Sequence, residues 1–183
     1  MNKILTAVFA FTLTIGLAYA ESFTGTTRVF PDWSHKTTGL TTVSETFASS
    51  LFTFTHTSGN GANQMNQLWH STETIVASGT NVIDLTGGIT NAFGTVLTMA
   101  EVRLLTFKAG STNASTIQIG GGASAFSSMF ADASDALLIR PGGFIMLVGP
   151  DATGYTAGSG NLTLINNSGA GVATIDIYIG ASD

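Results

Sequence analysis

Histidines and serines are the side chains of this chain that could support catalysis or bind a transition metal. The three histidines are His35, His56 and His70, and no two of them have the HxH or HxxxH spacing of paired metal ligands. Neighbouring strands could bring His56 and His70 together, with Glu73 as a carboxylate partner. The chain is rich in serine but has no GxSxG motif, so the signature of a serine hydrolase is missing. Separate structural histidines are the favoured interpretation.

Three aspartates lie near the loops that flank the most apolar segments. Asp132 and Asp135 belong to ADASDA, and Asp151 belongs to GPDATG. A Ca²⁺ site takes several oxygen ligands from a compact loop, but no DxDxDG loop is present. Aspartates in such loops more often cap turns through their own backbone. Ca²⁺ is thus the one candidate cofactor, with turn capping as the favoured role.

Trp33, Trp69 and Tyr155 are the aromatic residues that could form a platform for a sugar. An aromatic face packs against the C–H face of a pyranose ring when the side chain is exposed. Aromatic residues make up 9% of the chain, so core packing competes strongly for each of them. These three residues are the predicted carbohydrate-binding set.

The segment LLIRPGGFIMLVG contains a Pro-Gly-Gly that resembles a phosphate-binding loop. Such a loop leads into a helix and commonly supplies a lysine. Here Pro141, Gly142 and Gly143 precede the apolar run FIMLVG, and no lysine follows. Proline presets φ at the second position of a turn and glycine accepts a positive φ at the third. We therefore predict a type II turn.

The first residues of the chain have the order of a secretory signal peptide. Lys3 precedes an apolar run, and Ala18-Tyr19-Ala20 forms a small-x-small cleavage site. Residues 1–20 are therefore predicted to be a signal peptide, with the mature chain starting at Glu21 and no stable membrane anchor after its removal. The expected location is secreted or extracellular, with a virion as the alternative.

Composition excludes several functions of the mature chain. Charged residues make up 9% of the sequence, against about 25% in typical proteins, and the net charge is −5. No basic face for nucleic acid can be assembled from so few cations. Catalysis also needs charged groups with perturbed pKa values, so an enzyme is disfavoured. There is no cysteine and hence no disulfide or thiolate chemistry.

The elements that must position these residues are strands. Residues 21–61 are predicted to be a Thr/Ser-rich N-terminal arm or strand pair, and residues 62–183 a β-sandwich domain. In VATIDIYIG, Ile175, Ile177 and Ile179 alternate with polar residues, and NNSGAG before this segment predicts a hairpin with NLTLINN. One helical turn is expected at residues 98–101, and a brief helix or packed loop at residues 124–136.

About eight strands separated by close turn signals predict an all-β fold. Two antiparallel sheets packed face to face, in a jelly-roll-like sandwich, accommodate this pattern best.

The segments QLWHSTETI, VIDLTGGITNAFGTVLTMAEVRLLTF, GASAFSSMFADASDALLIRPGGFIMLVGPDATGY and the ending DIYIGAS occur in this order. Together they resemble small β-sandwich proteins, mostly uncharacterised, encoded among the virion genes of tailed bacteriophages. The resemblance covers about residues 67–183 and implies a building block of a virion without catalytic residues. The export signal is a departure, because tailed virions assemble in the cytoplasm.

The predicted function is a non-enzymatic structural protein whose β-sandwich subunits self-associate into a filament, coat or shell. A surface rich in Thr, Ser, Asn and Gly suits close packing of copies, since burying a hydroxyl costs less than burying an ion. The expected partners are other copies of the chain. The alternative is an extracellular carbohydrate-binding module, with Ca²⁺ as its candidate cofactor.

Overall fold

The computed structural model describes residues 24–29, 33–37, 43–47, 52–122, 126–158 and 160–183. These residues form fifteen strands in several antiparallel sheets and contain no helix. The predicted all-β class is therefore confirmed. The helical turn expected at residues 98–101 was wrong: residues 98–100 are irregular, and a strand begins at Glu101. The predicted signal peptide, residues 1–20, lies outside the described residues.

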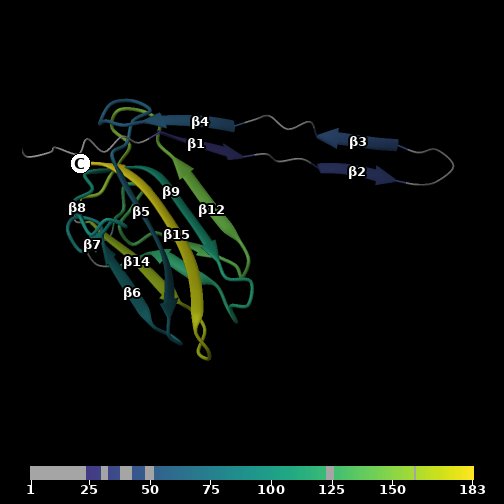
Figure 1. Ribbon diagram of the computed structural model, residues 1–183. Helices are drawn as coiled ribbons and strands as arrows, with labels where there is room; N and C mark the ends of the chain where they lie inside the picture. Colours follow the sequence, from purple (N-terminus) through teal and green to yellow (C-terminus); the bar gives the residue numbers. More distant parts are fainter. Residues whose placement is uncertain (1–23, 30–32, 38–42, 48–51, 123–125, 159) are drawn as a thin grey trace, which may run out of the picture.

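One large sheet, the β15 sheet, contains the longest strands (Figure 1). Its order is β12 (Phe144–Val148), β9 (Glu101–Ala109), β15 (Ala173–Ser182) and β5 (Gln67–Ile75). The short β13 (Tyr155–Thr156) also pairs with β9, beyond the end of β12.

The second large sheet, the β14 sheet, has four strands. Its order is β11 (Ala136–Ile139), β10 (Ile117–Gly120), β14 (Asn161–Asn166) and β6 (Thr80–Asp84). Across both sheets, the first half of the domain pairs with its second half in reverse order: β5 with β15, β6 with β14, β9 with β12, and β10 with β11.

The hairpin expected between NLTLINN and VATIDIYIG was wrong. These segments are β14 and β15, which belong to different sheets, so residues 167–172 cross from one sheet to the other. The Pro-Gly-Gly turn likewise connects β11 of the β14 sheet to β12 of the β15 sheet.

Buried residues from both sheets form one hydrophobic cluster. Ile175, Ile177 and Ile179 of β15 are at most 1% exposed, as their alternation with polar residues predicts. Leu162 and Leu164 of β14 belong to the same cluster. The β15 sheet and the β14 sheet therefore both contribute to one core.

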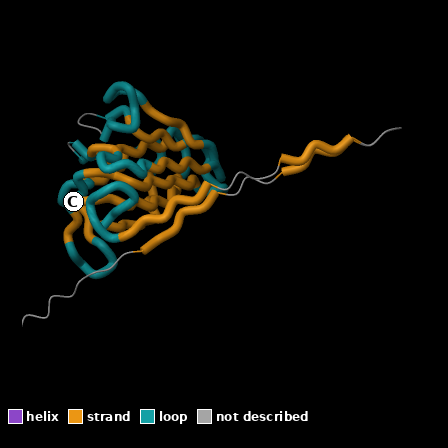
Figure 2. The backbone as a smooth tube through the Cα atoms, turned by 90° about the horizontal axis from the view of Figure 1, so that it is seen from above, coloured by secondary structure: helices purple, strands orange, loops and turns teal. Residues whose placement is uncertain are grey.

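Three two-stranded pairs complete the described structure. β1 (Thr24–Val29) pairs with β4 (Phe52–Thr57), and β2 (Trp33–Thr37) pairs with β3 (Val43–Phe47). We call these four strands the arm. In both views β2 and β3 lie beyond the outer ends of β1 and β4, away from the two large sheets (Figures 1 and 2). β7 (Ile89–Thr90) and β8 (Val96–Leu97) form a short hairpin that contributes Ile89 and Leu97 to the core.

Candidate functional site

The arm joins the domain at a buried cluster that we call the arm root, made of His56, Arg103 and the loop over residues 58–66. His56 lies near the end of β4 and is fully buried. The Thr57 amide donates to the Asn63 carbonyl, and the Met65 amide donates back to the Thr57 carbonyl. The last residues of the arm are therefore fastened to the domain by backbone hydrogen bonds.

Arg103 is the centre of the arm root and is only 1% exposed. Its guanidinium donates to the carbonyls of Asn60 at 3.0 Å and Ala152 at 2.7 Å, and also to the carbonyl of Asp151. It forms an ion pair with the Glu101 carboxylate. Arg103 thereby connects the loop after the arm, the loop after β12 and the start of β9.

A β-bulge explains why Arg103 has no partner on β15. Gly180 of β15 pairs with Leu104, but Ala181 pairs with Val102, so no residue of β15 is opposite Arg103. Bulges commonly redirect a side chain in this way. Gly180 lies between Leu68 of β5 and Leu104 of β9 in the sheet. An added Cβ at Gly180 would collide with the Met65 sulfur. The Met65 side chain therefore packs against β15 next to the bulge.

The surroundings of His56 disfavour protonation of its imidazole ring. Both of its ring nitrogens are buried and have no hydrogen-bond partner in the described residues. Burial lowers the pKa of the His56 imidazole, and the nearby Arg103 cation lowers it further. The neutral ring is therefore the form that the arm root accommodates.

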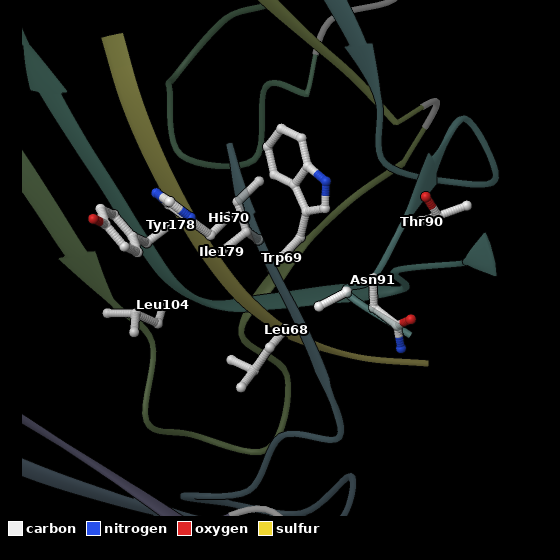
Figure 3. A pocket seen from close by; sticks show the side chains of 9 residues that line it. Leu68, Trp69, His70, Thr90, Asn91, Leu104, Tyr178 and Ile179 are labelled. Carbon is white, nitrogen blue, oxygen red and sulfur yellow. The ribbon is translucent and has the colours of Figure 1, made fainter. Parts of the chain in front are cut away.

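A hollow of about 450 Å³ lies at the β5 edge of the β15 sheet (Figure 3). Leu68, His70 and Tyr178 line it from the outer face of the sheet, and the His70 and Tyr178 rings stack with their centroids 4.3 Å apart. Trp69 and the loop residue Asn91 line it as well. Asn91 also borders a second, polar hollow of about 340 Å³ next to the C-terminus.

The aromatic residues predicted to bind carbohydrate are not gathered in one place. Trp69 lies on the outermost strand β5, whereas Tyr155 lies in β13, on the other side of β9 and β15. Both are half-buried and pack against the core. Trp33 is opposite Phe47 in the β2–β3 pair, and its side chain lies outside the described residues. Of the three, Trp69 lines a hollow.

The aspartates predicted as metal ligands fall in two separate loops. The Ser134 amide and hydroxyl donate to Asp132, and the Asp135 carboxylate accepts from the Asp132 amide. Asp151 accepts from the amides of Thr153 and Gly154. These bonds lower the pKa values of the Asp132 and Asp151 carboxyls. Within the part of the chain that the structure describes, no cluster of three or more ligating side chains could hold a metal ion.

Pro141, Gly142 and Gly143 form a tight turn. Gly142 has a φ of 74°, and the Gly143 amide donates to the Arg140 carbonyl at 2.9 Å. These features are those of a type II turn. The next residues enter β12 rather than a helix.

The structure separates the histidines. His56 is in the arm root, His70 stacks on Tyr178 in the β15 sheet, and His35 lies in β2. Glu73 accepts hydrogen bonds from Ser71 and Asn81 rather than from a histidine.

Arg103 is the residue that sequence reasoning missed. The sequence signal for Arg103 was a single cation inside the apolar segment VRLLTF. The alternation of a strand does not by itself say whether such a side chain is buried or exposed.

Comparison with models of known protein families gives no match for this chain. Comparison with curated protein sequences gives no significant match either. Among the described residues, no helix is long and apolar enough to cross a membrane.

Proposed function

We propose that this protein is a non-enzymatic structural subunit that is exported and self-associates into a filament, coat or shell. Its domain is proposed to be a jelly-roll sandwich. The support is the pairing of the first half of the domain with the second half in reverse order, which is the strand order of a jelly roll. The core shared by the two large sheets supports the sandwich.

The arm is the observation that carries the proposal. β2 and β3 pair with each other, and no third described strand joins them. An isolated two-stranded hairpin is marginally stable at best in water, because one pair of strands buries too little apolar surface. A partner surface would supply what the hairpin lacks. A second copy of the chain is the partner proposed, since the low charge and polar composition suit close packing of copies.

The sequence resemblance to virion proteins of tailed bacteriophages also supports a structural role. The predicted signal peptide favours an extracellular assembly, with a virion as the alternative location. Neither expectation requires a catalytic residue or a cofactor.

The test compares the mature chain with a variant that lacks the end of the arm. Residues 30–51 are replaced by a short Gly-Ser linker, so that β1 and β4 and the arm root remain. We expect the mature chain to form oligomers or polymers in sedimentation velocity, and the shortened variant to sediment as a folded monomer. A mature chain that is monomeric would contradict the proposal, and identical oligomers of the two proteins would contradict the role of the arm in it.

A second candidate function is binding of carbohydrate, which the hollow at the β5 edge favours. The hollow combines the partly buried Trp69 and the exposed Tyr178 with the amide of Asn91, and protein sites for sugars combine apolar faces with a few polar groups. The predicted Ca²⁺ dependence is part of this candidate.

Its test is calorimetry with defined hexose oligosaccharides, such as cellohexaose, maltohexaose and chitohexaose. Trp69→Ala should weaken binding at least tenfold, whereas Tyr155→Ala, a matched aromatic away from the hollow, should not. Addition of EDTA tests the role of Ca²⁺. Absence of binding to all three probes, or equal loss in both variants, would argue against a sugar site in this hollow.

A further inference from the structure

The outer edge of β12 has backbone groups that pair with no other described strand. The Ala109 amide donates to the Gly143 carbonyl at 2.9 Å, and the Gly149 amide donates to the Arg103 carbonyl at 2.8 Å. In an antiparallel pair, bonded residues alternate with unbonded ones. Residues 145 and 147 therefore also bond to β9, and the amides and carbonyls of residues 144, 146 and 148 point away from it. Among the described strands, β12 pairs with β9 alone.

This edge strand is apolar, and no described strand covers it. β12 contains no charged residue, and Phe144 at its start is 63% exposed. Leu138 in β11, across the Pro-Gly-Gly turn, is 60% exposed. Proteins normally protect an edge strand with charges, proline or a covering segment. At the opposite edge of the same sheet, β5 carries Glu73 and a row of hydroxyl residues.

We propose that the free edge of β12 receives strand β3 from the arm of a second copy of this chain. This inference rests on the proposed function, and it adds the surface onto which the arm docks. A strand that adds to a sheet edge binds through main-chain hydrogen bonds, with its side chains setting specificity. β3 and β12 are each five residues long, so their ladders match in length.

Charge selects β3 over β2 as the added strand. Lys108, opposite Phe144, and Arg140, in the turn before β12, are both exposed. β3 has the sequence VSETF, with Glu45 as its one charged residue, whereas β2 carries Lys36. Asp176, opposite Lys108 on β15, accepts a hydrogen bond from Thr72 on the far side. An anionic strand is therefore favoured next to the two cations.

The arm and the β12 edge are different surfaces of one chain, so the contact is heterologous. Each copy offers one arm and one β12 edge, and repetition of the contact gives either a closed ring or an open filament. The two large sheets of the domain need no rearrangement for this pairing, because no described strand occupies the outer edge of β12.

The test removes one unpaired amide from the edge. Met146→Pro deletes an N–H that points away from β9, and proline is tolerated on an edge strand in that position. Met146→Leu is the matched control, because it changes the side chain and keeps the amide. Sedimentation velocity measures assembly, and circular dichroism with thermal melting confirms folding. We expect Met146→Pro to weaken association at least tenfold, and Met146→Leu to assemble like the wild type.

A charge exchange provides a measurement that does not depend on the folding of the proline variant. Glu45→Lys should weaken association severalfold, and the further change Arg140→Glu should restore part of the loss. Absence of both effects, or a folded Met146→Pro protein that assembles like Met146→Leu, overturns the docking of β3 on β12.

The two proposals fail in different ways. If removal of residues 30–51 abolishes assembly but both edge tests show no effect, the arm docks elsewhere and only this inference fails. If dimers persist without residues 30–51 but vanish in Met146→Pro, two β12 edges pair with each other. That result also overturns the docking of β3 on β12. A wild-type chain that remains monomeric contradicts the proposed function and this inference together.

Discussion

Replacement of Arg103 by methionine should destabilise the domain strongly. Methionine keeps an unbranched side chain of similar length but cannot donate to the loops that meet at the arm root. The carbonyls of Asn60, Asp151 and Ala152 would each lose a charged donor. The Glu101 carboxylate would lose its cation.

The magnitude follows from the exposure of these partners. An unsatisfied buried acceptor costs about 1–3 kcal/mol, and the lower value applies here because Asn60, Asp151 and Ala152 are exposed residues that water can reach. Three carbonyls then cost about 3 kcal/mol. Glu101 is 32% exposed, so its uncompensated charge adds about 1 kcal/mol rather than the full penalty of a buried ion. The sum of about 4 kcal/mol corresponds to a decrease in Tm of roughly 8–16 °C for a chain of this size.

Urea denaturation, followed by tryptophan fluorescence and circular dichroism, measures the free energy of unfolding. Lys108→Met is the control, because it removes the same charge from an exposed position on the same strand and should change stability by less than about 0.5 kcal/mol. If Arg103→Met also costs less than about 1 kcal/mol, Arg103 does not hold the arm root together and the reasoning is refuted.

Three further predictions concern single residues. The pKa of His56 is lower in the folded chain than in the unfolded chain. The contribution of His56 to the free energy of unfolding is therefore complete above about pH 6.5 and is lost as the pH falls through the lowered folded value. The slope of this loss is up to about 1.4 kcal/mol per pH unit. Urea titrations from about pH 7.5 to about pH 5 should show this slope, and the slope should be smaller in His56→Phe. An unchanged slope in the variant would assign the pH dependence to another group. Gly180→Ala should lower the free energy of unfolding by about 1–3 kcal/mol, because the added methyl group collides with Met65. Met65→Ala in the same chain should recover part of that loss in a double-mutant cycle. Strictly additive effects of the two substitutions would show that the two residues do not touch. Intact mass spectrometry of the exported protein should give a chain that starts at Glu21, and a mass that includes residues 1–20 would contradict the predicted cleavage.

The strands of the domain were largely predictable from sequence, because their alternation is set by burial on one face. The isoleucines of β15 show this most clearly, since the predicted inward face is the buried face. The partners of each strand were not predictable in the same way. β14 and β15 have the alternation and the intervening turn residues of a hairpin, yet they lie in different sheets. A crossing between sheets and a hairpin within one sheet use the same turn chemistry, so the local pattern does not distinguish them.

The arm root was hidden from sequence analysis for a different reason. Its cation, Arg103, gains its partners from loops that lie more than forty residues away in the chain in either direction. The β-bulge that directs its side chain arises from the pairing of β9 with β15 rather than from a local sequence signal. Conversely, the Pro-Gly-Gly turn depends only on residues within it, and its conformation could be read directly from their types.

The most direct test of the proposed self-association is the mass of the mature chain in solution across a dilution series. Sedimentation velocity, with negative-stain electron microscopy of the same samples, gives both the mass and the shape of any assembly. Self-association predicts species larger than one chain that shift towards monomer on dilution, with rings or filaments visible by microscopy. A single monomeric species at every concentration would contradict it.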